Sequence, residues 1–332
     1  MTSGAPQTSR VTDKTFAILG GFVRGWSADK IGPSGLISRA NAAGRRPPLV
    51  WVLNDTKEFG AFADALGPDQ PLIAMRSLNT VIAPHRLTRA DVHSVAERYA
   101  QELGAILGKR PFFLGGNCQG AAIAAALARR LLLAGADLRG FAGMEWPDLP
   151  PLPVPVTLLF GADSPGHNPF LSGRDPVPVW ERIYPSHEVA ILPGSHGTYF
   201  DPERVADLVR VLRAMIATPR PARPVPDAPA LPVLGLPARC RAGERLAGAL
   251  SAPGGAGKDE IVVLWDPETP AMAHREPARP YRLPGGAELL RLSAPDRPGS
   301  WFVQTFRCRA GAGPLAWAEE SGRHRRIEVT AA

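Results

Sequence analysis

The chain has 332 residues, of which 45% are hydrophobic and 21% charged, and its formal net charge is +7. This composition is typical of a soluble globular protein, and the length predicts two domains. No apolar run reaches the ~20 residues of a membrane span, and residues 1–10 lack the basic start and apolar core of a signal peptide. We therefore expect a cytoplasmic protein without a membrane partner. Its arginines are scattered rather than interleaved with aromatic residues in a basic block, so nucleic acid is not an expected partner.

Residues 1–46 are mixed in composition and weakly periodic, and we expect them to form a surface lead-in to the first strand. Leu49–Leu53 is a continuous apolar run of the kind that a parallel sheet buries on both faces. The Asn54–Thr56 segment predicts a turn that caps a helix, and Gly67 is expected to end that helix. Pro71–Met75 is predicted to be the second strand.

Strands and helices continue to alternate beyond this point. A helix is expected to begin at Thr88, because Asp91 follows at the capping-box spacing and apolar residues recur at helical intervals. A strand and a helix are predicted within 111–133, followed by a last helix over about 201–216. Three strands are expected between them, at Gly140–Glu145, Val154–Phe160 and Glu188–Leu192. Such alternation predicts an α/β domain over 47–217, with a mostly parallel sheet and helices on both faces.

The pattern changes in the last third of the chain. Residues 218–237 hold seven prolines in twenty residues, a composition that extends a chain and predicts a linker. Residues 238–332 contain short β-type runs separated by Gly/Pro turns, and these predict a small, antiparallel, sandwich-like all-β domain.

The stretch 111–120 carries the main chemical signal. A bulky apolar segment runs into Gly116-Asn117-Cys118-Gln119-Gly120 and then into an Ala/Leu-rich run, which is the strand–turn–helix order of a nucleophile elbow. Cys118 would lie at the tip of the turn, at a helix N-terminus, where the helix dipole favours the thiolate. The alternative is that Cys118 is a small buried hydrophobic residue.

The chain has three cysteines, Cys118, Cys240 and Cys308. They have neither metal-ligand spacing nor a disulfide framework, so we expect no metal site. Cys240 and Cys308 could pair within the β-domain, but a reducing cytosol favours two buried thiols.

Candidates for the rest of a catalytic triad follow the elbow in chain order. In α/β-hydrolases the order is nucleophile, acid, histidine, and His196 lies after the last predicted strand. His167 and His187 are alternatives in less suitable places. Either Glu145 or Asp163 could orient and stabilise the imidazole, because each ends or follows a strand and one carboxylate is sufficient.

Residues 47–216 resemble the thioesterase domains of nonribosomal peptide and polyketide synthases. Ala65–Leu72 (ALGPDQPL) is similar to that family's ALGPDQPVY segment, and Phe113–Gly120 (FLGGNCQG) to its LLGGWSFGG elbow. Two later segments match its penultimate strand and its histidine loop, namely Pro155–Phe160 and Leu192–His196. The resemblance covers about half of the chain and does not extend to 238–332.

The resemblance implies an α/β-hydrolase fold, with Cys118 as nucleophile and His196 as base. In the family the acid often follows the strand after the elbow helix, which favours Glu145 over Asp163. The oxyanion hole would use the N–H of Gln119 and one from Asn54 or Asp55, although this loop departs from the family's HPAGG sequence. The substrate would be an acyl or peptidyl group on the phosphopantetheine of a carrier protein or synthase, and no other cofactor is implied.

Two further departures from the family affect the expected reaction. Cysteine replaces the usual serine, so the acyl-enzyme would be a thioester, which remains easily attacked by an amine or a hydroxyl group. We therefore expect transfer or ring closure as well as hydrolysis. The usual lid insertion is missing, because only residues 146–154 separate Glu145 from the next strand. The 164–186 segment, with Phe170 and Trp180, could provide an apolar wall for an acyl chain or could be ordinary packing.

The sequence thus predicts a thioesterase-type enzyme that releases or transfers an acyl or peptidyl group through Cys118. A hydrolase of small esters and an acyltransferase of the same fold remain alternatives. A catalytically degenerate hydrolase that serves as a docking module is the non-enzymatic alternative.

Overall fold

The chain divides into two compact units, Met1–Arg223 and Pro224–Ala332. The structure is a computed structural model, and it describes residues 9–83, 86–146, 152–172, 176–177, 180, 184, 186–218, 233–250, 259–267, 281–284, 289–296, 298–309 and 325–331. Most of the predicted linker, residues 219–232, lies outside these ranges, as do residues 147–151 of the short connection expected in place of a lid.

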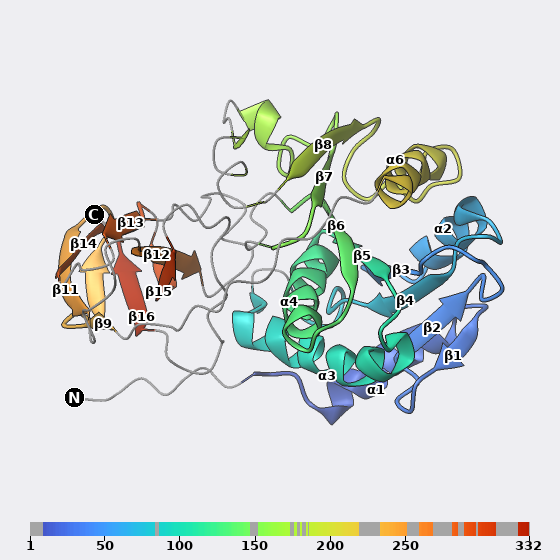
Figure 1. The fold of residues 1–332 in the computed structure, drawn as a ribbon, viewed down its shortest axis with the longest axis horizontal. Helices are drawn as coiled ribbons and strands as arrows, with labels where there is room; N and C mark the ends of the chain where they lie inside the picture. Colours follow the sequence, from blue (N-terminus) through green and yellow to red (C-terminus); the bar gives the residue numbers. More distant parts are fainter. Residues whose placement is uncertain are drawn as a thin grey trace. The chain divides into compact units, whose positions relative to one another are not determined.

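An eight-stranded sheet forms the centre of the first unit, with the strand order β1-β2-β4-β3-β5-β6-β7-β8 (Figure 1). Strands β3 to β8 run parallel, whereas β2 is antiparallel to both β1 and β4. The strands are β1 (Asp29–Ile31), β2 (Ile37–Ala40), β3 (Leu49–Leu53), β4 (Leu72–Arg76), β5 (Phe112–Asn117), β6 (Leu138–Met144), β7 (Val156–Gly161) and β8 (His187–Leu192). The predicted α/β-hydrolase-type, mostly parallel sheet is therefore confirmed.

Burial of the strands follows their position in the sheet. Every residue of β3, β4, β5 and β7 is buried, as expected for central parallel strands covered on both faces. The edge strand β8 is only partly covered, and Val189 and Ile191 are exposed on it. This difference explains why the apolar runs of the central strands were readily recognised in the sequence.

Helices cover both faces of the sheet (Figure 1). Helices α3 (Arg89–Leu107) and α4 (Gln119–Leu133) pack together, and α4 contacts β3, β5 and β6. Helices α2 (Glu58–Leu66) and α6 (Val205–Ala217) also pack together, with α6 against β6 and β8. The predicted capping box of α3 is present, with the Thr88 hydroxyl accepting from the Asp91 N–H. Among the described helices, none has the length and apolar character needed to cross a membrane.

The expected surface lead-in over 1–46 is wrong. Helix α1 (Asp13–Arg24) and the β1–β2 hairpin belong to the domain, because β2 extends the main sheet beside β4. Arg10 also joins this segment to α3, since its backbone N–H and its guanidinium both donate to Asp91, at 2.7 and 2.9 Å. The two hairpin strands have only three and four residues, too few for a recognisable alternation of apolar residues.

The second unit consists of a five-stranded and a three-stranded sheet. The strand orders are β10-β16-β15-β12-β13 and β14-β11-β9, with bounds β9 (Val233–Leu234), β10 (Arg239–Arg241), β11 (Arg245–Leu250), β12 (Asp259–Pro267), β13 (Tyr281–Pro284), β14 (Leu289–Ser293), β15 (Gly299–Arg309) and β16 (Arg325–Thr330). Both sheets contribute to one apolar core, which includes Leu246, Trp265 and Trp301. The β-rich character was predicted, but the pairing is not wholly antiparallel, because β10 and β16 run parallel. Cys240 is a buried free thiol in this core, and the side chain of Cys308 is outside the described part.

Candidate active site

Cys118 lies in the turn between β5 and α4, at the carboxyl edge of the sheet. Its backbone has φ 47° and ψ −121°, a conformation that costs a non-glycine residue energy and is typical of a nucleophile elbow. A Cβ atom on Gly120 would lie 2.2 Å from the Val52 carbonyl oxygen, and one on Gly116 would lie 2.5 Å from the Gly120 oxygen. The glycines of the motif are therefore required by close backbone packing. The Cys118 side chain is partly exposed.

Strand register brings Glu145 to the same edge as the elbow. Asn117 at the end of β5 pairs with Met144 at the end of β6, so the residues that follow these two, Cys118 and Glu145, are neighbours. The Cys118 N–H donates to the Met144 carbonyl oxygen at 2.8 Å. Glu145 has a positive φ of 54°, which turns the chain at the end of the strand, and its side chain is only 2% exposed.

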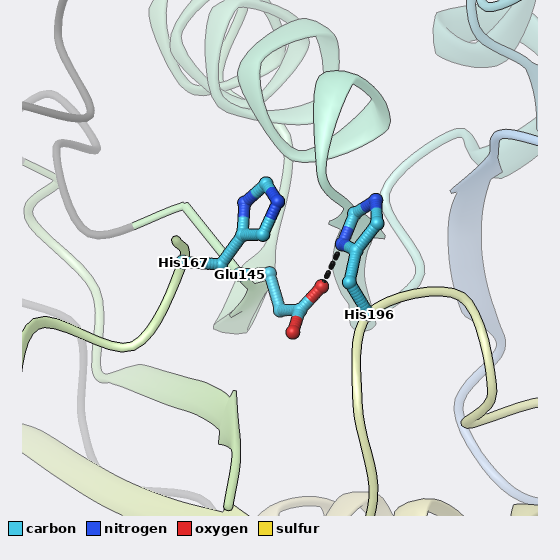
Figure 2. Close-up of side chains that lie close together, drawn as sticks. All are labelled: Glu145, His167 and His196. Atoms are coloured by element: carbon cyan, nitrogen blue, oxygen red, sulfur yellow. Dashed lines mark hydrogen bonds and ion pairs between the residues drawn. The ribbon is translucent and has the colours of Figure 1, made fainter. Parts of the chain in front are cut away.

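His196, in the loop after β8, connects the thiol and the carboxylate. Its Nδ1 is hydrogen-bonded to Glu145 Oε2 (Figure 2), and its ring also interacts with the Cys118 side chain. These two interactions, with Cys118 the larger, raise the pKa of His196 to about 10. A raised pKa means that this site stabilises the imidazolium form.

The Glu145 carboxylate is held by several donors. The Tyr199 hydroxyl donates to Oε1, and Tyr199 also has a hydrogen bond of 2.9 Å with the Ser164 hydroxyl. Burial alone would raise the pKa of Glu145, but hydrogen bonds from His196, Tyr199 and Ser164 outweigh it and leave the pKa below its ordinary value. Burial and the nearby Glu145 raise the pKa of Tyr199, so its hydroxyl remains a donor. The carboxylate is thus kept ionised although it is buried.

Asp163, the alternative acid, is not brought to His196. It is exposed in the loop after β7, where its N–H donates to the Gly194 carbonyl oxygen at 3.0 Å. Among the described residues its carboxylate has no hydrogen bond or ion pair with His196, whose Nδ1 is bonded to Glu145 instead.

His167, one of the two alternative histidines, lies beside His196 in the segment after β7. The two imidazole rings stack with their centroids 4.1 Å apart and their planes 12° from parallel (Figure 2). Burial, and then the charge of His196, lower the pKa of His167, so it is neutral at pH 7. His187, the other alternative, packs its ring against Trp180 at 6.1 Å.

Glu145, His167 and His196 each offer a ligand atom, and these atoms lie within 4.8 Å of one another. Imidazole lone pairs lie in the plane of the ring, so two stacked and nearly parallel rings cannot both direct a nitrogen at one ion. Glu145 Oε2 is also already bonded to His196. The arrangement therefore suits proton transfer better than metal binding.

The oxyanion donors expected in the loop after β3 are otherwise engaged. The N–H groups of Asn54 and Asp55 both donate to Glu58 Oε2, at 2.8 and 3.1 Å. The Lys57 N–H donates to Asp55 Oδ1 at 2.9 Å, whereas the Thr56 N–H has no hydrogen bond within the described part of the chain. The sequence placed this role on Asn54 or Asp55 because it could not show that the Glu58 side chain accepts from both N–H groups.

The other expected oxyanion donor, Gln119, is the first residue of α4. A first-turn N–H has no intrahelical partner, and none is found for it among the described residues. Its side-chain amide is buried and has no hydrogen-bond partner in the described structure. The Gln119 N–H is therefore available beside Cys118.

The possible apolar wall for an acyl chain divides into two parts. Trp180 is only 1% exposed and stacks on Phe160 at 5.8 Å, so it belongs to the core. Phe170 is 39% exposed and meets both rings edge-on. Only Phe170 of this pair is available to a ligand.

Comparisons with known proteins give matches among solved structures only. Neither a family model nor a curated protein matches the chain. The thioesterase domain of NocB, from the nocardicin cluster, is 19% identical with a TM-score of 0.45, over 55% of this chain and 99% of that chain. YbtT, a type II thioesterase from the yersiniabactin NRPS/PKS pathway, is 15% identical with a TM-score of 0.42, over 55% of this chain and 98% of YbtT. The thioesterase domain of Vlm2 is 14% identical with a TM-score of 0.44, over 55% of this chain and 99% of the Vlm2 domain.

Proposed function

We propose that this protein is a thioesterase-type enzyme that accepts an acyl or peptidyl group from a carrier-protein thioester and releases it through a Cys118 acyl-enzyme. One observation carries the proposal: His196 is hydrogen-bonded to the buried Glu145 carboxylate and also interacts with the side chain of the elbow residue Cys118. A nucleophile, a base and a group that orients the base are the parts that nucleophilic catalysis requires. The resemblance of 113–120 to a thioesterase elbow indicates the substrate class.

Acylation uses the thiol and the imidazole. His196 holds the Cys118 proton, as the imidazolium that the site stabilises, while the sulfur attacks the thioester carbonyl carbon. The resulting oxyanion collapses, the carbon–sulfur bond to the pantetheine arm breaks, and His196 returns the proton to the leaving sulfur. The products are a thioester on Cys118 and a free pantetheine thiol. Glu145 accepts from Nδ1 throughout and stabilises the imidazolium that forms.

Release repeats the sequence with a new nucleophile. His196 takes a proton from water, or from a hydroxyl or amine group, as that group attacks the acyl carbon of the Cys118 thioester. Cys118 leaves and regains its proton from His196. Because the intermediate is itself a thioester, an amine or a hydroxyl group of the acyl chain can compete with water, so ring closure and transfer are accessible outcomes.

The oxyanion is assigned two backbone donors. The Gln119 N–H adjoins the nucleophile at the start of α4, where the helix dipole also favours negative charge. In the loop after β3, Thr56 provides the second donor. Its N–H has no partner among the described hydrogen bonds, whereas the N–H groups of Asn54, Asp55 and Lys57 are all engaged. This assignment replaces Asn54 and Asp55 as donors.

A thiol-release assay tests the proposal. An acyl-phosphopantetheinyl carrier protein or an acyl-N-acetylcysteamine thioester is mixed with the enzyme, and the free thiol is measured by its absorbance with Ellman's reagent. Cys118→Ala should abolish release, and Asp163→Asn should leave it nearly unchanged. If the enzyme instead cleaves only p-nitrophenyl esters, it is an ester hydrolase. If neither substrate reacts and Cys118 resists iodoacetamide, the docking-module alternative holds.

A further inference from the structure

Glu58 occupies an unusual place beside the proposed active site. It is the first residue of α2, and both of its carboxylate oxygens are engaged by groups from elsewhere in the site. Oε2 accepts from the N–H groups of Asn54 and Asp55, at 2.8 and 3.1 Å, so two backbone donors converge on one oxygen. Oε1 accepts from Asn117 Nδ2 at 3.0 Å, and Asn117 is the residue before Cys118. One carboxylate therefore joins the loop after β3 to the elbow.

The orientation of Asn117 makes this junction specific for a carboxylate. Trp51 Nε1 donates to Asn117 Oδ1 at 3.2 Å, which fixes the amide so that its NH₂ group faces Glu58. Glu58 thus receives donors on both oxygens and needs no donor of its own. A glutamine side chain at this position would set its NH₂ group against another N–H donor whichever way it turned.

The loop and the elbow are joined a second time through the buried side chain of Asn54. Its Nδ2 donates to the Asn117 carbonyl oxygen at 2.6 Å, and its Oδ1 accepts from the Gly120 N–H at 3.1 Å. The Ser77 hydroxyl, after β4, also donates to Oδ1 at 2.6 Å. Asn54, predicted as a backbone oxyanion donor, therefore caps the elbow helix with its side chain.

We propose that Glu58 is a positioning residue that holds the loop after β3 against the elbow, so that the Thr56 and Gln119 N–H groups are placed together for the oxyanion. The inference rests on the proposed function. Glu58 acts through the backbone of the loop and does not touch the reacting atoms. By engaging the Asn54 and Asp55 N–H groups, it also fixes which donor the loop leaves for the substrate.

The electrostatic setting of Glu58 supports this role. Burial raises its pKa to about 6, although hydrogen bonds from Asp55, Asn54 and Asn117 and the charge of Arg76 act in the opposite direction. Arg76, at the end of β4, is the cation that faces it, and Asp55 and Tyr99 lie near that arginine as well. When Glu58 takes up a proton, one oxygen becomes a donor and loses its bond to the loop or to Asn117. The position of the loop therefore depends on the ionised carboxylate.

The test compares E58Q with the matched control E203Q, whose glutamate is exposed in the turn before α6. Two inhibitors are used with each variant. An acyl trifluoromethyl ketone forms a tetrahedral oxyanion with Cys118, whereas the corresponding acyl amide binds without reaction. In E58Q we expect kcat/KM and trifluoromethyl ketone affinity to fall together by about 10- to 100-fold, because a misplaced donor weakens the oxyanion alone. Amide affinity should change less than about threefold, since the amide carries no oxyanion.

If E58Q lowers the affinity for both inhibitors equally, or for neither, the inference is overturned. The proposed function stays intact in that case, provided that the wild type still acylates Cys118. A wild type that does not acylate Cys118 removes the proposed function itself. If E58Q does not fold, the same comparison is made on the wild-type protein between pH 8 and 5. Ketone affinity should then decline through about pH 6 while amide affinity is unchanged, and a parallel decline of both would contradict the proposal.

Discussion

Replacing Glu145 with glutamine tests the assignment of the acid. The carboxylate is buried and accepts from His196 Nδ1 and from the Tyr199 hydroxyl. In E145Q the amide oxygen can still accept from His196, while the amide NH₂ group faces Tyr199. The Tyr199 hydroxyl can rotate to accept from it and donate to Ser164 instead. The variant should therefore fold, having lost a charge without leaving a buried group unpaired.

The size of the effect of E145Q on acylation follows from the change in one hydrogen bond, the one between His196 and residue 145. A charge-assisted bond contributes about 1.5–3 kcal/mol and a neutral one about 0.5–1.5, so the loss is about 1–1.5 kcal/mol. This corresponds to an acylation rate about tenfold lower. It also corresponds to a fall of about one unit in the pKa of His196, which lies at about 10 in the wild type. A single-turnover acylation assay and an NMR titration of the His196 ring measure these two quantities.

Stability should change with a definite pH dependence. The folded-state pKa of His196 is raised, so its contribution is fully present below about pH 6.5 and is lost as the pH rises through about 10. E145Q should reduce the free energy of unfolding by roughly 1 kcal/mol near pH 6, a modest value because the imidazole is 44% exposed to solvent. The difference should shrink towards pH 10. An unchanged His196 pKa in E145Q, or a larger loss of activity in D163N, would refute the assignment of Glu145.

Three further predictions concern the nucleophile, the elbow and the stacked histidine. Cys118→Ser should shift the products of a substrate with an internal nucleophile towards the free acid, as measured by chromatography, and an unchanged ratio would count against a role for the thioester. Gly120→Ala should lower the free energy of unfolding by about 2–4 kcal/mol in urea, because its Cβ would meet the Val52 oxygen at 2.2 Å. The control Gly104→Ala, in α3 with nothing within 4 Å, should be neutral or stabilising by up to about 1 kcal/mol. His167→Phe keeps a stacked ring and should retain acylation, whereas His167→Ala should slow it by up to about tenfold; equal rates in the two variants would contradict a role for the stack.

Most of the sheet could be predicted from the sequence, because its central strands are covered on both faces. Runs such as Leu49–Leu53 and Val156–Gly161 are apolar throughout and are buried throughout. The β1–β2 hairpin was missed because such short strands carry no clear alternation, and they take their place only by pairing with β4. Propensity and periodicity are local, whereas this pairing is a long-range contact.

The proposed catalytic residues were accessible to sequence reasoning because chain order and fold jointly limit where they can lie. Cys118, Glu145 and His196 each follow a strand at the carboxyl edge. Glu58 and Tyr199 gave no comparable signal. Glu58 looks like an ordinary acidic residue in the first turn of a helix, and only the folded chain shows that the Asn54 and Asp55 N–H groups converge on it. Their roles arise from contacts between segments rather than from any local pattern.

The proposed mechanism requires that Cys118 carry the acyl group, so the residue that becomes acylated must be identified. The protein is incubated with an acyl-pantetheine thioester, quenched in acid, digested and examined by mass spectrometry. We expect an added acyl mass on the peptide that contains Cys118, absent in Cys118→Ala and formed more slowly in His196→Ala. An acyl group on another residue would contradict the role of Cys118. So would the absence of an adduct if Cys118→Ala still released free pantetheine thiol at the wild-type rate.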